Sequence, residues 1–177
     1  PHTSGVWVCL VLDLVCICSP KGPGSTFGTA APLIHLLSTG TLATQAAAAK
    51  TLWHLAGTSD SATAIATAGG FPPLCSMLSS EDVHAQELAA VIITRLLKSK
   101  SSVSFTVAEG GGIVPLVRLL RDGSSAGQQQ AACAIAEVGL EPQNRDLIAD
   151  AGGIDALVAL LTSSVVGTPE TAGRALA

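Results

Sequence analysis

The 177-residue sequence is poor in aromatic and charged residues. It has no Tyr, three Phe and two Trp, and Asp, Glu, Lys and Arg together make up only 12% of it. Ala, Leu, Val and Ile must therefore supply most of the core, which suits closely stacked layers of helices better than a single aromatic-centred core. The net charge of −4 gives no cationic surplus to displace counterions from a phosphate backbone, so we expect no nucleic-acid partner.

The sequence also lacks an apolar run long enough to cross a membrane. The longest candidate, residues 5–18, contains Asp13 and falls short of the ~20 apolar residues that a spanning helix needs. It is either the core of a signal peptide or the last helix of a preceding, degenerate repeat, and the repeat register favours the second interpretation. Residues 19–26, SPKGPGST, are expected to be a linker because proline and glycine disfavour a helix. We assign residues 1–27 to a degenerate repeat or an unstructured segment, with no direct insertion into a membrane.

Motifs for catalysis and for cofactors are missing as well. No Ser, His and Asp residues form a nucleophile and base motif, and the glycines of the linker are not followed by the Gly-Lys-Ser/Thr of a phosphate loop. Cys16 and Cys18 could be half of a metal site, but no second ligand pair stands at a suitable spacing. We therefore expect no enzyme activity, no metal and no cofactor.

The cysteines point to a reducing compartment. Their number is odd, and Cys75 and Cys133 are expected to be buried within helices. Reduced thiols of this kind predict a cytoplasmic or nuclear protein.

What the sequence does contain is one unit repeated along the chain. Four apolar hexads, PLIHLL (32–37), PLCSML (73–78), PLVRLL (115–120) and ALVALL (156–161), place equivalent leucines 41, 42 and 41 residues apart. A fixed period of this length is typical of helical repeats that must stack to bury their apolar faces. The equivalent leucines are Leu33, Leu74, Leu116 and Leu157.

A second, longer helix follows each of the first three hexads in the same phase. We predict these long helices at about 42–57, 83–98 and 126–140, after polar turns that can cap them. Four apolar positions match in all three copies: Ala48, Ala49, Leu52 and Leu55; Ala89, Ala90, Ile93 and Leu96; Ala131, Ala132, Ile135 and Val138.

A short third helix is predicted before each of the later hexads, within 62–70, 104–112 and 146–153. Each has an aliphatic residue four positions before an aligned glycine, which we expect to end the helix as a C-cap: Gly69, Gly111 and Gly152. The repeats then cover about 28–68, 69–110 and 111–151, with a truncated copy at 152–177. Since the chain starts with Pro and its last helix looks cut, we expect it to be part of a longer array that associates with itself through uncapped ends.

The units AEGGGIVPLVRLL (108–120) and NRDLIADAGGIDALVALL (144–161), each preceding or following an Ala-rich helix, resemble the armadillo repeat family over about 28–177. HEAT repeats are the nearest alternative, and the AGG-I-x-x-L-V-x-L-L joint favours armadillo. The resemblance implies an all-α, right-handed solenoid that acts as a non-catalytic scaffold. In this family the long helices line a concave groove that binds an extended peptide or a partner helix.

The resemblance places a partner-binding groove on the long helices. Import receptors of the family carry Trp and Asn there, but this chain has other residues at those positions, so we do not expect a receptor for basic signals. The groove residues that we expect are Lys50, Trp53, His54, Glu87, Val91, Arg95, Gln129, Cys133 and Glu137.

Three of these residues have alternative roles. His54 is expected to be a half-exposed polar residue rather than a ligand or base, because no group stands at a spacing that would orient it. Trp53 is favoured as a core residue, with a binding hot spot as the alternative. Arg95 either contacts the partner or pairs with Glu137, a contribution of about 0–1 kcal/mol to stability.

Two other functions remain open for the whole protein. The chain resembles the substrate-recognition part of plant ubiquitin ligases that join a U-box to armadillo repeats, and it also resembles membrane-tethered adaptors of the vacuolar armadillo type. A U-box would identify the first and an N-terminal acylation signal the second.

Overall fold

The computed structural model describes residues 26–99, 110–162 and 168–176. These residues form ten α-helices and no strand, as the all-α prediction required. Among them no helix has the length and apolar character needed to span a bilayer. The expected degenerate repeat, nearly all of the expected linker and most of the predicted short helix at 104–112 lie outside the described residues.

The helices follow one another in the predicted order, hexad helix, long helix, short helix. The hexad helices are α2 (Thr26–Thr39), α5 (Phe71–Leu78), α8 (Ile113–Asp122) and α11 (Gly153–Leu161). The long helices are α3 (Leu42–Leu55), α6 (Val83–Ser99), α9 (Ser125–Val138) and α12 (Thr168–Leu176). The described short helices are α4 (Ser59–Thr67) and α10 (Pro142–Asp150).

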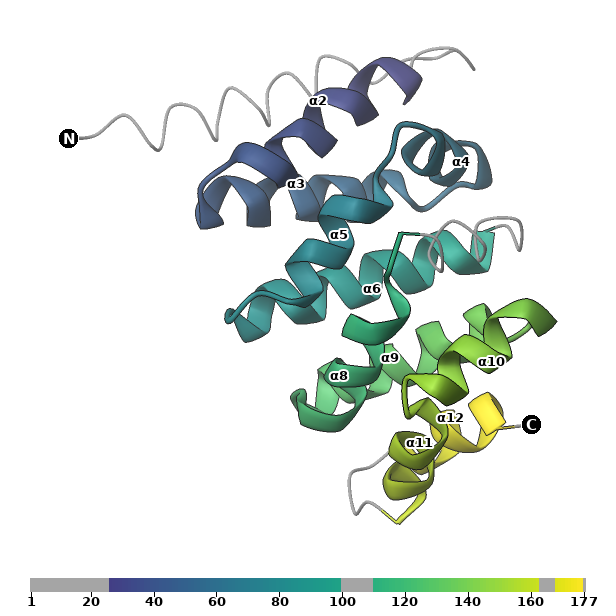
Figure 1. Ribbon diagram of the computed structural model, residues 1–177. Coiled ribbons are helices and arrows are strands. Elements are labelled where there is room, and N and C mark those ends of the chain that lie inside the picture. The colour runs from purple at the N-terminus through teal and green to yellow at the C-terminus, as the bar shows by residue number, and fades with distance from the viewer. Residues whose placement is uncertain (1–25, 100–109, 163–167, 177) are drawn as a thin grey trace.

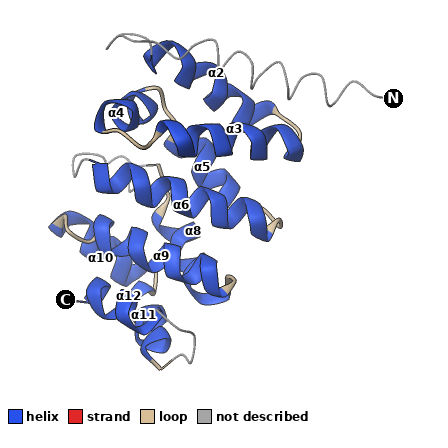
Figure 2. Cartoon of the chain, turned by 180° about the vertical axis from the view of Figure 1, so that it is seen from behind, coloured by secondary structure: helices blue, strands red, loops and turns tan. Residues whose placement is uncertain are grey.

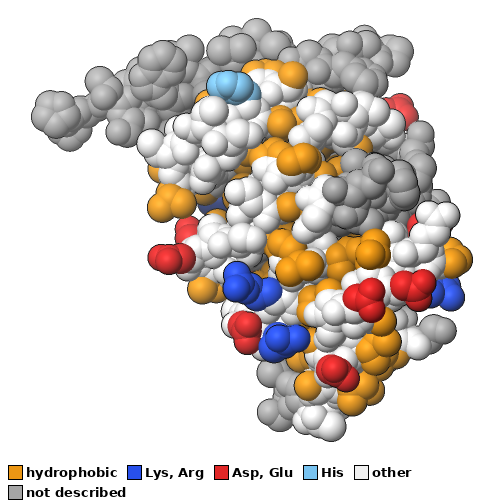
Figure 3. Space-filling view, in the orientation of Figure 1, with side chains coloured by type: hydrophobic (Ala, Val, Ile, Leu, Met, Phe, Trp, Pro, Cys, Tyr) orange, Lys and Arg blue, Asp and Glu red, His pale blue; other side chains and the backbone are white. Residues whose placement is uncertain are grey.

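The long helices form a layer of their own. The hexad helices α5, α8 and α11 and the short helix α10 lie toward the viewer in Figure 1, whereas the long helices stack in front in the reverse view of Figure 2. Figure 3 shows the side of the hexad helices as a space-filling surface, in the orientation of Figure 1. Each long helix packs on the next, α3 on α6, α6 on α9 and α9 on α12. The chain is therefore an α-solenoid, in which residues about one repeat apart become neighbours.

The periodic apolar positions make the core. All four hexad leucines are buried, and of the twelve matched long-helix positions only Leu55 is partly exposed. Alanine at two of the four positions in each copy leaves little side chain between helices, so the layers approach closely. Phe71 is the largest fully buried side chain and fills the space at the start of α5.

The glycine joints are also confirmed. Gly69, Gly111 and Gly152 have φ values of 78°, 69° and 78°, the left-handed conformation that a glycine after a helix C-terminus adopts most easily. The glycine that follows has a different role. A Cβ on Gly70 would lie 2.7 Å from Ile65 Cγ2, and one on Gly153 would lie 2.6 Å from Ile148 Cγ2. At these two joints the predicted aliphatic residue, Ile65 or Ile148, therefore packs directly on the second glycine.

The turn into each long helix is held by side chains. Thr41 and Ser124 accept hydrogen bonds from main-chain amides of the first turn, and Asp82 Oδ1 accepts one from the His84 amide at 2.9 Å. These bonds satisfy amide groups that have no partner inside the helix. The prediction that the polar turns cap the long helices is confirmed.

A glutamine near the start of α3, α6 and α9 adds a bond that the sequence analysis missed. The side-chain amides of Gln45, Gln86 and Gln128 donate to main-chain carbonyls at or just after the end of the preceding hexad helix, over 2.9, 2.6 and 3.4 Å. The acceptors are Leu37, Ser80 and Arg121. Because helix C-termini leave carbonyl groups unpaired, this bond closes the hairpin between the hexad helix and the long helix in these three copies.

Helix bounds differ slightly from the predictions. α3 ends at Leu55 and α9 at Val138, each two residues before the predicted end, and α2 begins at Thr26, the last residue of the expected linker. The long helices end early where the chain turns into the next short helix, α4 or α10.

Candidate partner-binding face

The nine expected groove residues lie on the three long helices α3, α6 and α9. The side chains of Lys50 and His54 are exposed and the other seven are partly exposed. None is fully buried, so a partner lying across the long helices can reach side chains from each of three repeats. We call the surface formed by these nine residues the long-helix face.

On the long-helix face, ring and guanidinium contacts join α3 to α6. The guanidinium carbon of Arg95 lies 4.9 Å from the centroid of the Trp53 ring, at the distance of a cation–π contact. The His54 ring meets Trp53 edge-on, with centroids 4.6 Å apart and planes at 74°. Trp53 also packs against the core and is half-buried, as the favoured core role requires.

Glu87 is tied to the neighbouring repeat. Its Oε1 accepts a hydrogen bond from the hydroxyl of Ser124, the residue that caps α9. The same hydroxyl accepts a bond from the Gly127 amide at 3.0 Å. The carboxylate is thus held in place on α6.

The α9 part of the face is more acidic. Gln129, Cys133 and Glu137 are partly exposed there. The burial expected for Cys133 is therefore wrong, because Cys133 stands on the partly exposed long-helix face. In the part of the chain that the structure describes, Arg95 is paired with Trp53 and forms no ion pair with Glu137.

α12 contributes two further charged residues that the sequence analysis missed. Glu170 and Arg174 are exposed and stand 41 residues after Gln129 and Cys133, so they continue the face by one repeat. The repeat spacing alone could have identified them. With these two residues, the face carries Lys50 and His54 on α3, Glu87 and Arg95 on α6, Glu137 on α9, and Glu170 and Arg174 on α12.

Cys75 behaves as a structural thiol. It is buried within α5, and this burial raises its pKa from the ordinary 9.0 to about 11. The described residues contain neither a disulfide at Cys75 or Cys133 nor a group of three His, Cys, Asp or Glu residues that could hold a metal ion.

The chain has similar proteins of known structure. It matches the crystal structure of an engineered protein with a TM-score of 0.84 and 26% identity, covering 99% of this chain and 75% of that one. It matches a designed armadillo repeat protein in complex with the peptide (KR)4 with a TM-score of 0.82 and 22% identity, covering 94% of this chain and 72% of the other. These likenesses confirm the predicted fold.

Sequence similarity to curated proteins is more local. Over 77 residues the chain is 31% identical to U-box domain-containing protein 11 of Arabidopsis thaliana, a match that covers 44% of this chain and 13% of that protein. No protein-family model matches the chain.

Proposed function

We propose that this chain, an armadillo-repeat solenoid, is a non-catalytic scaffold that binds an extended peptide or a helix of a partner protein on its long-helix face. One observation carries the proposal: Trp53, His54 and Arg95 form a partly exposed cluster that crosses from one repeat to the next. Trp and Arg are the residue types most enriched at the energetic centres of interfaces, and here each fixes the orientation of the other before a partner arrives.

The charge order of the face supports an elongated partner. Lys50 on α3 and Arg95 on α6 are interspersed with Glu87 on α6 and Glu137 on α9, so a bound segment that carries charges of both signs would meet opposite charges on successive repeats. Such complementarity mainly gives orientation and specificity. The designed protein in complex with (KR)4 has the same fold, which supports a peptide as the kind of ligand.

A pull-down from the cytosol of the source organism tests this proposal. The full chain is compared with a Lys50→Ala, Arg95→Ala, Glu137→Ala variant, and bound proteins are identified by mass spectrometry. The control removes two cations and one anion from exposed positions of the hexad helices, as Arg118→Ala, Arg121→Ala, Asp155→Ala.

We expect a partner that is retained by the parent chain and by the control and is lost by the first variant. A partner set shared by all three proteins would refute the long-helix face as the binding surface. Titration of the identified partner segment into the single Trp53→Ala variant then isolates the cluster, where a loss of about tenfold or more in affinity is expected.

A ubiquitin ligase is the second candidate, favoured by the local identity to the plant U-box protein. In that case the long-helix face selects the substrate, and a U-box elsewhere in the same polypeptide recruits the conjugating enzyme. Sequencing the complete transcript decides this: a U-box coding region in frame supports the ligase, and a complete reading frame without one removes it.

The proposal places the protein in the cytoplasm, and the two free thiols support a reducing compartment. Fractionation of source cells with an antibody to the chain tests this. Recovery in the membrane fraction that is released only by detergent would favour a tethered adaptor instead.

Self-association is proposed through the end formed by α11 and α12. The α11 side chains at three positions are 41 to 49% exposed, whereas the equivalent side chains of α8 are at most 5% exposed because the next repeat covers them. The α11 residues are Ile154, Val158 and Leu161, and their α8 equivalents are Ile113, Val117 and Leu120. Sedimentation should show oligomers that an Ile154→Glu, Val158→Glu variant abolishes, and a monodisperse parent chain would contradict the idea.

A further inference from the structure

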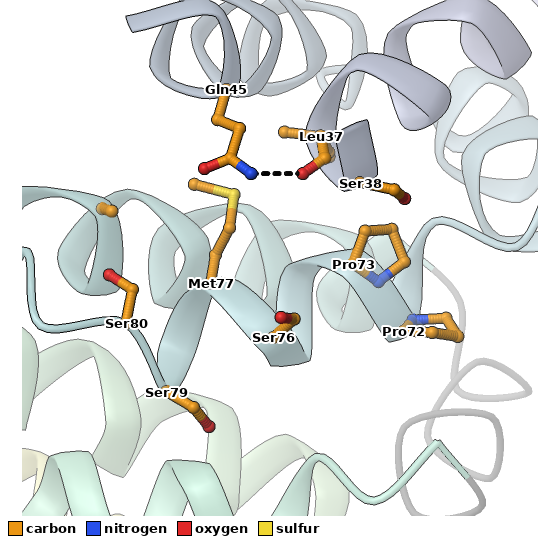
Figure 4. A pocket seen from close by; sticks show the side chains of 10 residues that line it. Leu37, Ser38, Gln45, Pro72, Pro73, Ser76, Met77, Ser79 and Ser80 are labelled. Atoms are coloured by element: carbon orange, nitrogen blue, oxygen red, sulfur yellow. Dashed lines mark hydrogen bonds between the residues drawn. The ribbon is translucent and has the colours of Figure 1, made fainter. Parts of the chain in front are cut away.

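A surface pocket of about 610 Å³ lies between the first two described repeats, on the edge where hexad helices turn into long helices. Figure 4 shows Pro72, Pro73, Ser76 and Met77 of α5 lining it, opposite Gln45 and the end of α2. Gln45 is held there by its bond to the Leu37 carbonyl, drawn as a dashed line in Figure 4. The pocket lies at the start of α3, whereas Trp53 and His54 lie at the end of the same helix.

The same crevice recurs one repeat later but is much smaller. Its volume between α5 and α8 is about 230 Å³, and Gln86 and Leu119 occupy the positions of Gln45 and Met77. Two of the lining side chains that differ are larger and charged in the second crevice. Arg118 and Asp122 line the second crevice at the positions that Ser76 and Ser80 hold in the first.

The chemistry of the larger pocket is uncharged throughout. Its lining combines prolines, the flexible thioether of Met77 and several hydroxyl groups. The hydroxyls of Ser76 and Ser79 are on exposed residues and, within the described chain, form no hydrogen bond. The long helices on its two sides each begin with an exposed aliphatic residue, Leu42 at 63% and Val83 at 51%.

We propose that this pocket binds an uncharged, bulky side chain, aromatic or leucine, from a peptide segment of a partner protein. The apolar side chain would lie against Met77 and the prolines, and the peptide backbone would bond the free hydroxyls of Ser76 and Ser79. Pockets of this size with mostly apolar walls and a few polar groups are typical ligand sites. The absence of charge from the lining selects against Lys, Arg, Asp and Glu, because a charge buried there would have no partner. This is a second surface, separate from the long-helix face.

Amide chemical shifts of the isotope-labelled full chain test the proposal. The probes are N-acetyl-tryptophanamide and N-acetyl-leucinamide, with N-acetyl-lysinamide as the charged control. We expect shifts at Gln45, Ser76 and Met77 with the two apolar probes, at an affinity of about millimolar for molecules of this size. Equal shifts with the lysine probe, or shifts confined to the long-helix face, would overturn the assignment.

Two variants distinguish a loss of the pocket from a loss of the fold, because one should close the first crevice and the other should open the second. Ser76→Arg installs the side chain that the second crevice carries at an equivalent helix position, so α5 can hold it, and we expect binding about tenfold weaker. The reverse change, Arg118→Ser with Asp122→Ser, should open the second crevice and produce new shifts near Leu119. The proposal would be overturned if Ser76→Arg bound the apolar probes as tightly as the parent chain and the Arg118→Ser, Asp122→Ser variant showed no new shifts near Leu119. Binding of free indole but of no capped amide would show a small-molecule site and would overturn the peptide assignment.

Discussion

Substituting Gly69 or Gly70 with alanine adds the same methyl group to the joint between α4 and α5, yet the two changes should destabilise the fold for different reasons. Gly69 has φ of 78°, and a Cβ there would meet no atom within 4 Å. Gly70 has φ of −69°, which any residue adopts, but its Cβ would meet Ile65 Cγ2 at 2.7 Å and the Ile65 carbonyl oxygen at 2.8 Å. The first substitution strains the backbone and the second overfills the joint.

The magnitudes follow from these geometries. Gly69→Ala should lower the free energy of unfolding by about 1–2 kcal/mol, the difference between left-handed and right-handed conformations for a residue with a Cβ. Gly70→Ala should cost about 3 kcal/mol, at the upper end of the range for overpacking, because one of the overlapping atoms is a main-chain oxygen that cannot rotate away.

Asparagine separates the two mechanisms. It tolerates the left-handed conformation better than alanine, so Gly69→Asn should be less destabilising than Gly69→Ala. At Gly70 the order should reverse, since asparagine places more atoms into an occupied space. Gly111, with φ of 69° and no atom within 4 Å of its Cβ position, serves as a replicate of Gly69.

Urea denaturation followed by far-ultraviolet circular dichroism measures all of these differences in the free energy of unfolding. Added support would come from Ile65→Ala, which should relieve part of the cost of Gly70→Ala and none of the cost of Gly69→Ala. If alanine is more destabilising than asparagine at both Gly69 and Gly70, or less destabilising at both, the two glycines do not have these separate roles.

Four further predictions concern bonds and thiols. Gln86→Ala should lower the free energy of unfolding by about 1 kcal/mol, because it removes the bond to the Ser80 carbonyl in the turn after α5, and urea denaturation measures the loss. A double-mutant cycle of Glu87→Gln and Ser124→Ala should give a coupling of about 1 kcal/mol, whereas additive effects would show that the bond between α6 and α9 contributes nothing. Iodoacetamide at mildly alkaline pH should label Cys133 well before Cys75, because Cys75 is buried and its pKa is raised to about 11. Since the unfolded thiol ionises first, near 9.0, Cys75 should also make the chain less stable as pH rises from 9.0 to about 11, a pH dependence that is absent in Cys75→Ala.

The geometry of the long-helix face was predicted only in part, and the errors have physical causes. The nine residues were placed by repeat register, which gives their position along each helix. Register does not give the depth of a side chain, and Cys133 was therefore expected to be more buried than it is. It also does not give lateral partners, so the stacking of Arg95 on Trp53 was not foreseen.

The sequence by itself determined the period, the kinds of helix within it and the glycine joints. These features depend on local rules: apolar side chains repeat along one helix face, polar residues cap a helix, and glycine alone adopts the left-handed conformation without cost. Each rule acts within one repeat, and the same residue pattern recurs in the next repeat.

Only the tertiary structure decided what lies between repeats. The bond from Ser124 to Glu87, the Trp53 and Arg95 contact and the pocket beside Met77 all join residues about one repeat apart or fill the space between neighbouring copies. Their existence depends on side-chain rotamers and on the volume left by residues such as Ser76 in place of an arginine. The rotamers and the volume between repeats are set by packing in three dimensions, and the period of the helices does not determine them.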